Sequence, residues 1–239
     1  MRRWGAWLLF LGAACAQTPT FDVASVKPSP PSPSDAIYIT LGAVNHGVVR
    51  MTNVTLGECV RWAYDLVSAE QLTGPAWIEE RATRFDIIAK ASPDTPLRQL
   101  RLMMRALLAE RFALKLHSEP KRIEHYELTV SKAGLKLAVS PGDGPSHSPE
   151  YRTGVLNWSH LPMHTLAILL ARQLKLLVLD STNVSGFYDV NLQWTPDDAD
   201  VAGVDIFSAL RKVGLNLERL KSPVDIWTVD SAEKTPREN

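Results

Sequence analysis

Neither sign of charge is in excess in this 239-residue chain, which has 26 Lys+Arg, 26 Asp+Glu and a formal net charge of 0 at pH 7. A near-neutral surface produces no long-range field that would attract nucleic acid or anionic lipid. The composition therefore predicts no nucleic-acid partner. Because 45% of the residues are hydrophobic, the chain has enough apolar material for a sizeable core.

The chain also lacks a long hydrophobic run near its N-terminus. The apolar stretch Trp4–Ala14 has about eleven residues, whereas a membrane-spanning helix needs roughly 20. Arg2 and Arg3 precede this stretch, and small residues stand at positions 14 and 16. The pattern is typical of a secretory signal, so we predict a signal peptide over residues 1–16, cleaved after Ala16. We therefore expect an exported protein, periplasmic or secreted, with no integral membrane span after cleavage.

Cysteine is scarce, with Cys15 and Cys59 as the two examples. Lipidation at Cys15 is an alternative to cleavage after Ala16. It is disfavoured because Gly12 stands three residues before Cys15, where a larger aliphatic residue is expected. Retention of the segment as an uncleaved anchor is a further alternative. Cleavage removes two of the basic residues, so 24 basic residues would face 26 acidic ones.

Cleavage would leave Cys59 as the one cysteine of the mature chain, which excludes an intramolecular disulfide. An exported protein without that covalent link depends on its apolar core. Cys59 lies on the apolar side of a predicted helix, so we expect a buried and unreactive thiol.

Motifs of nucleophilic catalysis are also missing. Ser118-Glu-Pro-Lys121 fits the Ser-x-x-Lys pattern of penicillin-recognising enzymes. That chemistry needs the serine at a helix start and a partner motif such as Lys-Thr-Gly, which does not occur here. Since Pro120 and the predicted strand context also argue against it, we interpret the match as coincidental.

The spacing of the histidines in the sequence does not indicate a metal-binding site. His160 and His164 could place two imidazoles near each other, but Pro162 interrupts the helix that would align them, and no cysteine or acidic ligand is nearby in the sequence. His117 and His125 flank a predicted turn, and we interpret them as surface residues of a hairpin. The sequence therefore predicts no metal-binding, cofactor-binding or catalytic residue, and no cofactor.

Two aspartates stand at equivalent positions after an aromatic residue, Asp86 and Asp189. Paired carboxylates can perform acid–base catalysis if the fold brings them together. The alternative is a repeated structural role, such as capping a turn or pairing with Arg84, and we favour it.

Arginine and tryptophan residues leave two further alternatives. Arg98, Arg101 and Arg105 form a stripe on a predicted helix, with Arg111 to one side. They could bind an anionic ligand, but a solvated helix face is the ordinary explanation. Three tryptophans could stack on sugars or lie in strands of a core: Trp158, Trp194 and Trp227.

An internal repeat is indicated by segments that align in the same order in the two halves of the chain. The paired segments are Gly47–Leu56 with Gly154–Met163, the helices Glu58–Leu66 with Thr165–Leu174, the strands Arg84–Ala89 with Phe187–Leu192, the helices Leu97–Phe112 with Asp205–Val213, and Tyr126–Val130 with Ile226–Asp230. Thr55-Leu-Gly-Glu58 is a capping box, and Gly214 stands where a left-handed residue would end a helix.

These signals predict an α+β fold of two related repeats, each a small, mainly antiparallel sheet with two helices packed on one face. Ser140–Glu150 is rich in Pro, Gly and Ser, which is typical of a linker or exposed loop. The expected organisation is a signal peptide over 1–16, a first α+β repeat over 17–139, a linker over 140–150, a second α+β repeat over 151–230 and a disordered tail over 231–239.

Several blocks of residues also resemble one known family. The blocks are Phe21–Pro28, Gly74–Trp77, Arg84–Lys90, Leu107–His117, Tyr126–Gly134, Val178–Thr182, Gly186–Asp189 and Gly214–Glu218. Together they make the chain similar to a soil-associated protein family of unknown function that is expanded in Acidobacteria. The resemblance implies a bacterial, exported and uncharacterised protein. Asn183 stands where relatives carry Gly, and because Asn tolerates a left-handed conformation, we expect the turn to survive.

In some relatives a similar domain follows a membrane peptidase of the antibiotic-sensor type, which implies a sensory or partner-binding role there. This chain lacks the His-Glu-x-x-His sequence of such a peptidase. We therefore expect a non-enzymatic binding or interaction module that meets an unidentified protein or a cell-envelope ligand. The alternatives are a cell-envelope hydrolase that uses carboxylates, and an adhesion or scaffold protein whose edge strands pair with a partner.

Overall fold

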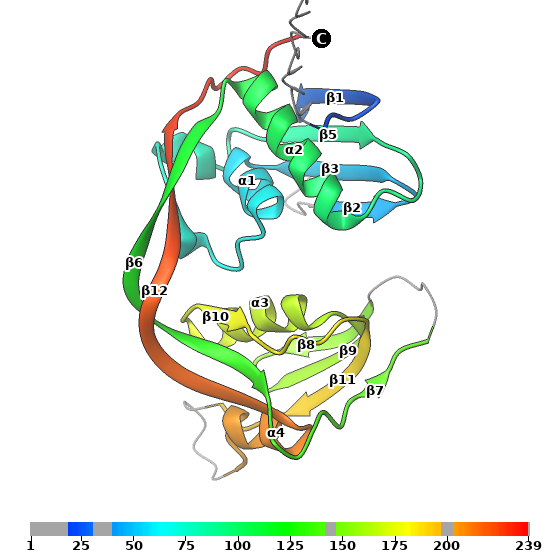
Figure 1. Cartoon of the computed structure of the whole chain (residues 1–239), viewed down its shortest axis with the longest axis vertical. Helices are drawn as coiled ribbons and strands as arrows, with labels where there is room; N and C mark the ends of the chain where they lie inside the picture. Colours follow the sequence, from blue (N-terminus) through cyan, green and yellow to red (C-terminus); the bar gives the residue numbers. More distant parts are fainter. Residues whose placement is uncertain (1–18, 31–39, 142–146, 197–202, 239) are drawn as a thin grey trace, which may run out of the picture.

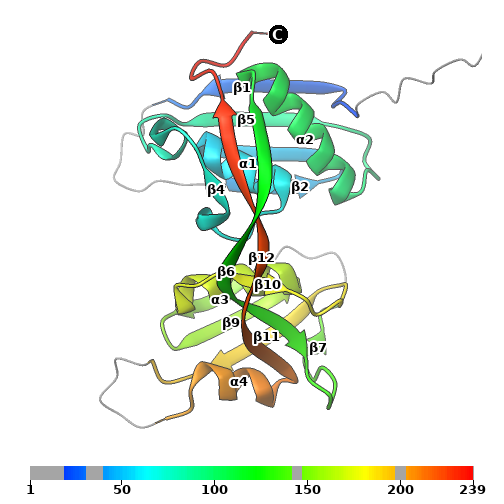
Figure 2. The same cartoon turned by 60° about the vertical axis from the view of Figure 1, so that its left-hand side comes forward.

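The computed structural model describes residues 19–30, 40–141, 147–196 and 203–238. Two lobes are joined along one side by a long two-stranded ribbon (Figure 1). The view turned by 60° shows this ribbon crossing both lobes (Figure 2). The described residues form four α-helices and mainly antiparallel sheets, so the predicted α+β class is confirmed. The predicted signal peptide lies outside the described residues.

The first lobe is a four-stranded antiparallel sheet with the order β1-β5-β3-β2. Its elements are β1 (Val23–Pro28), β2 (Thr40–Asn45), β3 (Val48–Val54), β5 (Phe85–Lys90), α1 (Leu56–Tyr64) and α2 (Leu97–Phe112). Three short elements follow α1: η1 (Ala69–Gln71), β4 (Leu72–Thr73) and η2 (Ala76–Glu79).

Both helices of this lobe cover one face of the sheet. In β5, Phe85, Ile87 and Ala89 are buried, while Ile88 between them is 43% exposed. This alternation of period two places one strand face in a core and the other in solvent. The buried side chains pack with those of α1 and α2 in a single apolar cluster.

The ends of α1 follow from its sequence. The Thr55 hydroxyl accepts a hydrogen bond from the Glu58 N–H, and the Glu58 carboxylate accepts one from the Thr55 N–H, at 3.2 and 2.7 Å. The predicted capping box is therefore confirmed. The helix ends at Asp65, whose left-handed backbone (φ 60°) turns the chain away.

The second lobe is built in a similar order around the sheet β7-β11-β9-β8. Its elements are β7 (Ala138–Val139), β8 (His147–Arg152), β9 (Val155–Leu161), α3 (Met163–Leu174), β10 (Val178–Asp180), β11 (Tyr188–Gln193) and α4 (Ile206–Lys212). Tyr188, Val190 and Leu192 of β11 are buried in alternation with exposed residues. They pack with side chains of α3 and α4 in a second apolar cluster.

Two long strands connect the lobes, β6 (Lys115–Val130) and β12 (Leu215–Ser231). They pair antiparallel over almost their whole length, from Leu215 opposite Val130 to Ser231 opposite Lys115. The third sheet is β10-β6-β12-β4, and both outer strands are short and parallel to the strand they join.

The predicted turn between His117 and His125 is wrong. β6 runs through this stretch without interruption, and Pro120 pairs with Asp225 of β12. Proline is tolerated in a strand whose outer edge faces no neighbour, because the missing N–H has no ladder partner there. His125 is fully buried rather than on the surface of a hairpin.

The expected boundaries of the repeats also differ from the structure. β8 begins at His147, inside the segment predicted as a linker. β6 and β12 each contribute side chains to both cores, so neither lobe coincides with one continuous half of the chain. Local composition cannot reveal this, because the exchange of strands between lobes is a long-range feature.

The C-terminal segment predicted as a disordered tail packs on the first lobe over its described part. The Glu233 and Arg237 N–H groups donate to the carbonyls of Phe112 and Arg111, both at 2.7 Å. These are orphan carbonyls at the end of α2, so the segment satisfies the helix terminus. Among the described residues no helix is both long enough and apolar enough to cross a membrane.

Candidate functional site

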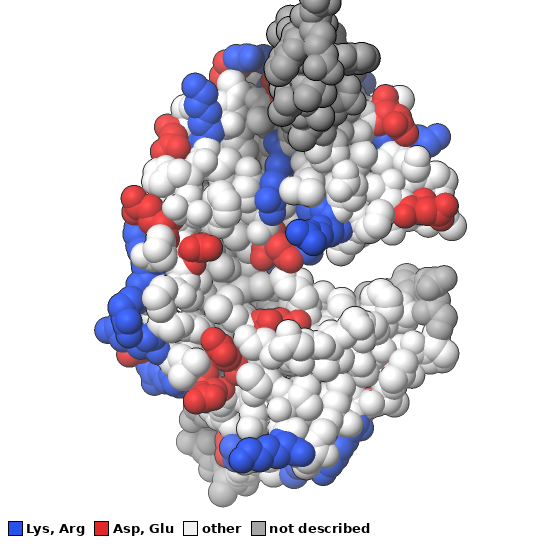
Figure 3. Space-filling model, in the orientation of Figure 1, with Lys and Arg blue, Asp and Glu red and all other residues white. Residues whose placement is uncertain are grey.

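A cleft of about 890 Å³ separates the two lobes. The space-filling view shows it as a notch that opens on the side opposite the ribbon, with charged residues of both signs near its inner end (Figure 3). α1, the segment after it and the start of α2 form the wall on the first lobe, and α3 with the end of β9 forms the wall on the second. Its size falls within the range of roughly 300–1,000 Å³ that is typical of small-molecule sites.

Apolar side chains from both lobes face this cleft without being covered. Val44 is 43% exposed, Leu97 46% and Phe187 40%, and all three line the cleft. Trp62 and Trp158 line it as well, one from each lobe. Large apolar side chains that gather at one concave surface mark an interaction site more often than scattered ones do.

A polar contact crosses the cleft. Nε2 of His164, at the start of α3, lies 3.0 Å from Oδ1 of Asp65, the residue that ends α1. The other carboxylate oxygen of Asp65 lies 2.5 Å from the Arg101 guanidinium. Burial is the largest influence on the pKa of His164 and lowers it. The negative charges of Asp65 and Asp180 raise this pKa, and the positive charge of Arg101 lowers it. The balance favours the neutral imidazole.

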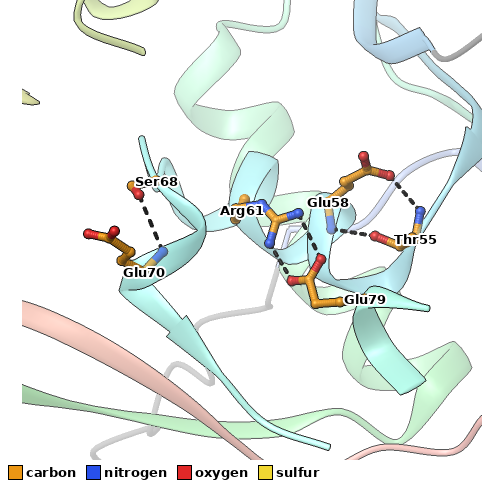
Figure 4. A network of polar contacts seen from close by, with 6 residues as sticks. All are labelled: Thr55, Glu58, Arg61, Ser68, Glu70 and Glu79. Atoms are coloured by element: carbon orange, nitrogen blue, oxygen red, sulfur yellow. Dashed lines mark hydrogen bonds and ion pairs between the residues drawn. The ribbon is translucent and has the colours of Figure 1, made fainter. Parts of the chain in front are cut away.

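Two charged side chains on the α1 wall, Arg61 and Glu58, have partners within the first lobe (Figure 4). Arg61 forms a bidentate ion pair with Glu79, one bond of which measures 3.1 Å. The Glu79 carboxylate approaches the helix so closely that a Cβ at Gly57 would lie 2.1 Å from it. Glu58 is engaged in the capping box, and the Ser68 hydroxyl accepts from the Glu70 N–H. The charges of Arg61 and Glu58 are therefore engaged within the first lobe, beside the uncovered apolar groups of this wall.

The aspartates considered for catalysis have structural partners instead. Asp86 accepts hydrogen bonds from the Asn53 N–H at 2.8 Å and the Ser29 hydroxyl at 2.6 Å. Asn53 has a left-handed backbone, with φ 58°, and its carbonyl accepts from Arg84.

Asp189 makes the corresponding contacts in the second lobe. It accepts from the His160 N–H at 3.2 Å and the Ser140 hydroxyl at 2.8 Å. His160 also has a positive φ, 59°. Each carboxylate thus holds a left-handed residue near the end of the strand that leads into a helix.

The histidine and serine motifs are placed as follows. His160 is buried and its ring stacks on Phe187, 3.9 Å between centroids, whereas His164 reaches Asp65. Ser118 and Lys121 are three residues apart in β6, and an odd spacing in a strand places two side chains on opposite faces. Within the described residues no three His, Cys, Asp or Glu side chains form a group that could hold a metal ion.

The arginine stripe on α2 is not a simple solvated face. Arg105 donates to the carbonyl of Ala63 at 2.9 Å and its guanidinium lies over the Tyr64 ring. Arg101 lies 6.0 Å from the centroid of Trp62 and pairs with Asp65. Both cations therefore meet the C-terminal end of α1, where the helix dipole favours positive charge. Arg98 is exposed.

The other residues singled out from the sequence serve the cores. Trp194 packs against the second core, and Trp227 contacts Tyr64 with tilted rings, 4.5 Å between centroids. Cys59 is fully buried, as expected, and burial raises the pKa of its thiol.

A smaller cavity of about 420 Å³ lies between α2 and the residues around β1. Its charged lining residues are Asp22, Glu110 and Arg111. The Arg111 guanidinium donates to the carbonyl of Arg237 at 3.3 Å and lies 3.5 Å from Glu110. The Nε of Arg111 is buried without a hydrogen-bond partner among the described residues. The cavity has about half the volume of the cleft between the lobes.

Sequence reasoning missed the cleft as a whole. It named His164 and Arg101, but not Asp65, which they meet. The one available signal was the helical spacing of Glu58, Arg61 and Asp65 on one side of α1. That spacing shows that the three residues share one face of α1, but it does not show which element lies opposite that face.

Fold and site together define a two-lobed α+β protein with a cleft between its lobes. Residues 57–232 match the family model described as "Protein of unknown function (DUF3738)". The chain belongs to this family, and the matched region runs from the first turn of α1 to just beyond β12, so it includes parts of both lobes. Searches of curated proteins and of solved structures found no match.

Proposed function

We propose that this protein is an exported binding module whose ligand occupies the cleft between the two lobes. The observation that carries the proposal is the exposure of Val44, Leu97 and Phe187 at one cleft, with a tryptophan on each wall. Water contact with so much apolar surface costs free energy that an apolar ligand would recover. The signal-peptide pattern and the resemblance to a soil-associated bacterial family support a location outside the cytoplasm.

The ligand class follows from the apolar lining and from the two arginines of the first lobe. Arg172 and Lys175 of the second lobe also line the cleft, and both are exposed. Arg61 and Arg101 already have carboxylate partners within the protein, so a ligand that replaced them would have to break an ion pair. Apolar contact involves no such loss. We therefore favour a small molecule of the cell envelope with an apolar body over a highly charged ligand.

We also propose that the two lobes are related repeats. The support is the repeated use of an aspartate, Asp86 or Asp189, that accepts from the N–H of a left-handed residue and from a serine hydroxyl. In each lobe a helix follows directly after that left-handed residue's strand. A duplicated scaffold places two comparable walls, α1 and α3, on either side of one cleft.

A fluorescence titration with N-phenyl-1-naphthylamine, a neutral apolar probe, tests the binding site. Binding in the cleft should quench Trp62 and Trp158 and raise probe emission. Val44→Asp and Phe187→Asp should each weaken binding about tenfold, which corresponds to 1.4 kcal/mol. Ile88→Asp is the matched control, because Ile88 is as exposed as Val44 but lies outside the cleft.

The proposal fails if the probe does not bind, or if Ile88→Asp weakens binding as much as the cleft variants do. Urea denaturation of each variant would separate lost binding from lost folding.

A further inference from the structure

The chain passes between the lobes twice, and both passages lie in the ribbon. β6 leaves the first lobe after α2, and β12 returns to it after α4. At one end of the ribbon, Leu116 and Val229 pack in the first core; at the other, Leu128 and Leu215 pack in the second. The two cores are separate clusters, so the ribbon is the covalent link between two independently packed bodies.

The middle of the ribbon has two strands only. β10 pairs with β6 over Tyr126–Leu128, and β4 pairs with β12 at Trp227 and Thr228. Between these short pairings the residues of β6 from 119 to 122 are all exposed. Two-stranded ribbons twist and bend more readily than wider sheets, because no third strand restrains them.

Prolines mark this middle stretch on both strands. Pro120 of β6 pairs with Asp225, and Pro223 of β12 pairs with Arg122. Neither proline has an N–H for a ladder, which keeps the free edges of the ribbon from recruiting further strands. On the packed side, Val224 and Ile226 are buried yet belong to neither core cluster. These two side chains are therefore buried outside both core clusters.

The cleft shows what movement about this stretch would do. The exposed apolar residues Val44 and Leu97 of the first lobe and Phe187 of the second line opposite walls, so closure would cover them. The contact between Asp65 and His164 spans the walls in the present arrangement. It is a polar contact between partly exposed side chains, and such contacts contribute little enough to be exchanged.

We propose that the two lobes close over the ligand by bending of the ribbon at residues 119–122 of β6 and 223–226 of β12, with the Asp65–His164 contact holding the ligand-free separation. This proposal rests on the proposed binding function and adds a hinge to it. Closure onto a ligand removes the apolar side chains of both walls from contact with water. Hinge closure of this kind absorbs the change in a few residues while each body remains rigid.

Distances between spin labels test the hinge in the full chain. Cysteines at Lys90 and Val139, in a Cys15→Ala/Cys59→Ala background, place one label on each lobe; both sites are exposed. β5 ends, and β7 lies, on the side of the molecule away from the ribbon (Figure 1), where closure moves the lobes most. Labels at Lys90 and Arg98, both in the first lobe, form the control pair.

The first arm needs no ligand. His164→Ala removes the imidazole that meets Asp65 and introduces no backbone strain, because alanine is favourable in a helix such as α3. The hinge predicts a broadened, shifted distance distribution between the lobes and an unchanged distribution for the control pair. An unchanged distribution between the lobes, in a variant that still folds, overturns the proposal.

The second arm adds N-phenyl-1-naphthylamine at saturating concentration. The hinge predicts a shift to shorter distances between the lobes, again with no change in the control pair. Probe binding without that shift overturns the hinge and leaves the binding function intact. If the probe does not bind, the proposed function fails while the first arm still decides the hinge.

Discussion

Oδ1 of Asp65 lies 3.0 Å from Nε2 of His164, so the carboxylate that ends α1 meets the imidazole that begins α3 across the cleft. The two residues are far apart in the chain and belong to different lobes. Their contact places a titratable side chain between the lobes.

The pH dependence of stability should reflect this environment. Burial lowers the pKa of His164 in the folded state, so the unfolded chain binds a proton more readily at this residue. Stability therefore falls as pH decreases from about 6.5, the usual pKa of histidine, toward the lower folded value. Above that window the contribution is fully present.

Urea denaturation at a series of pH values across this window would measure the effect. His164→Gln should show a shallower loss of stability with decreasing pH than the wild type, because the residue that titrates is gone. An identical pH slope in the two proteins would contradict the prediction.

Asp86 should matter for stability rather than for chemistry. Asp86→Ala leaves the Asn53 N–H and the Ser29 hydroxyl without their acceptor, which should cost about 1–3 kcal/mol. Asp86→Asn keeps an acceptor oxygen and should cost less. Asp94→Ala, at an exposed position, is the control, and equal unfolding free energies for Asp86→Ala and this control would refute the structural role.

Two glycines with left-handed backbones should respond differently to a methyl group. Gly186→Ala places a Cβ in open space at φ 100°, so it should show backbone strain alone, about 1–2 kcal/mol. Gly214→Ala places a Cβ 2.0 Å from the carbonyl oxygen of Gly134 at φ 83°, so backbone must also move. Denaturation midpoints should fall further for Gly214→Ala; the reverse order would show that the approach to Gly134 is not restrictive.

The buried thiol of Cys59 should be inert in the native protein. Burial raises its pKa, and the thiolate is the reactive form. A chromogenic disulfide reagent should label Cys59 only when the protein is unfolded in guanidinium chloride. Rapid labelling of Cys59 under native conditions would mean that the first core opens readily.

Local features were predicted well because their causes are local. The capping box of Thr55 and Glu58 and the helices around it depend on residues within one turn of each other. The left-handed conformations of Asn183 and Gly214 were also expected, and their φ values are 54° and 83°. Side-chain volume and hydrogen bonding within a few residues determine such positions.

The environment of the arginines of α2 could not be predicted from local sequence. The sequence places Arg101 and Arg105 on one helix face, and a face rich in arginine is ordinarily exposed to solvent. In the structure α1 ends against that face, so Arg101 meets Asp65 and Arg105 meets the Ala63 carbonyl. No pattern within α2 indicates which helix end lies beside it.

From the sequence alone the four helices and several of the strands could be predicted, because hydrophobic period, caps and left-handed turn residues act over a few positions. Only the tertiary structure decided that β6 continues through Pro120, where local preference indicated a turn. The pairing of Pro120 with Asp225 of β12 stabilises the extended chain there, and a ribbon edge without a neighbour has no need of the missing N–H. The long pairing of β6 with β12 joins two separately packed cores along one side. The cleft lies between these two lobes, so it depends on that pairing.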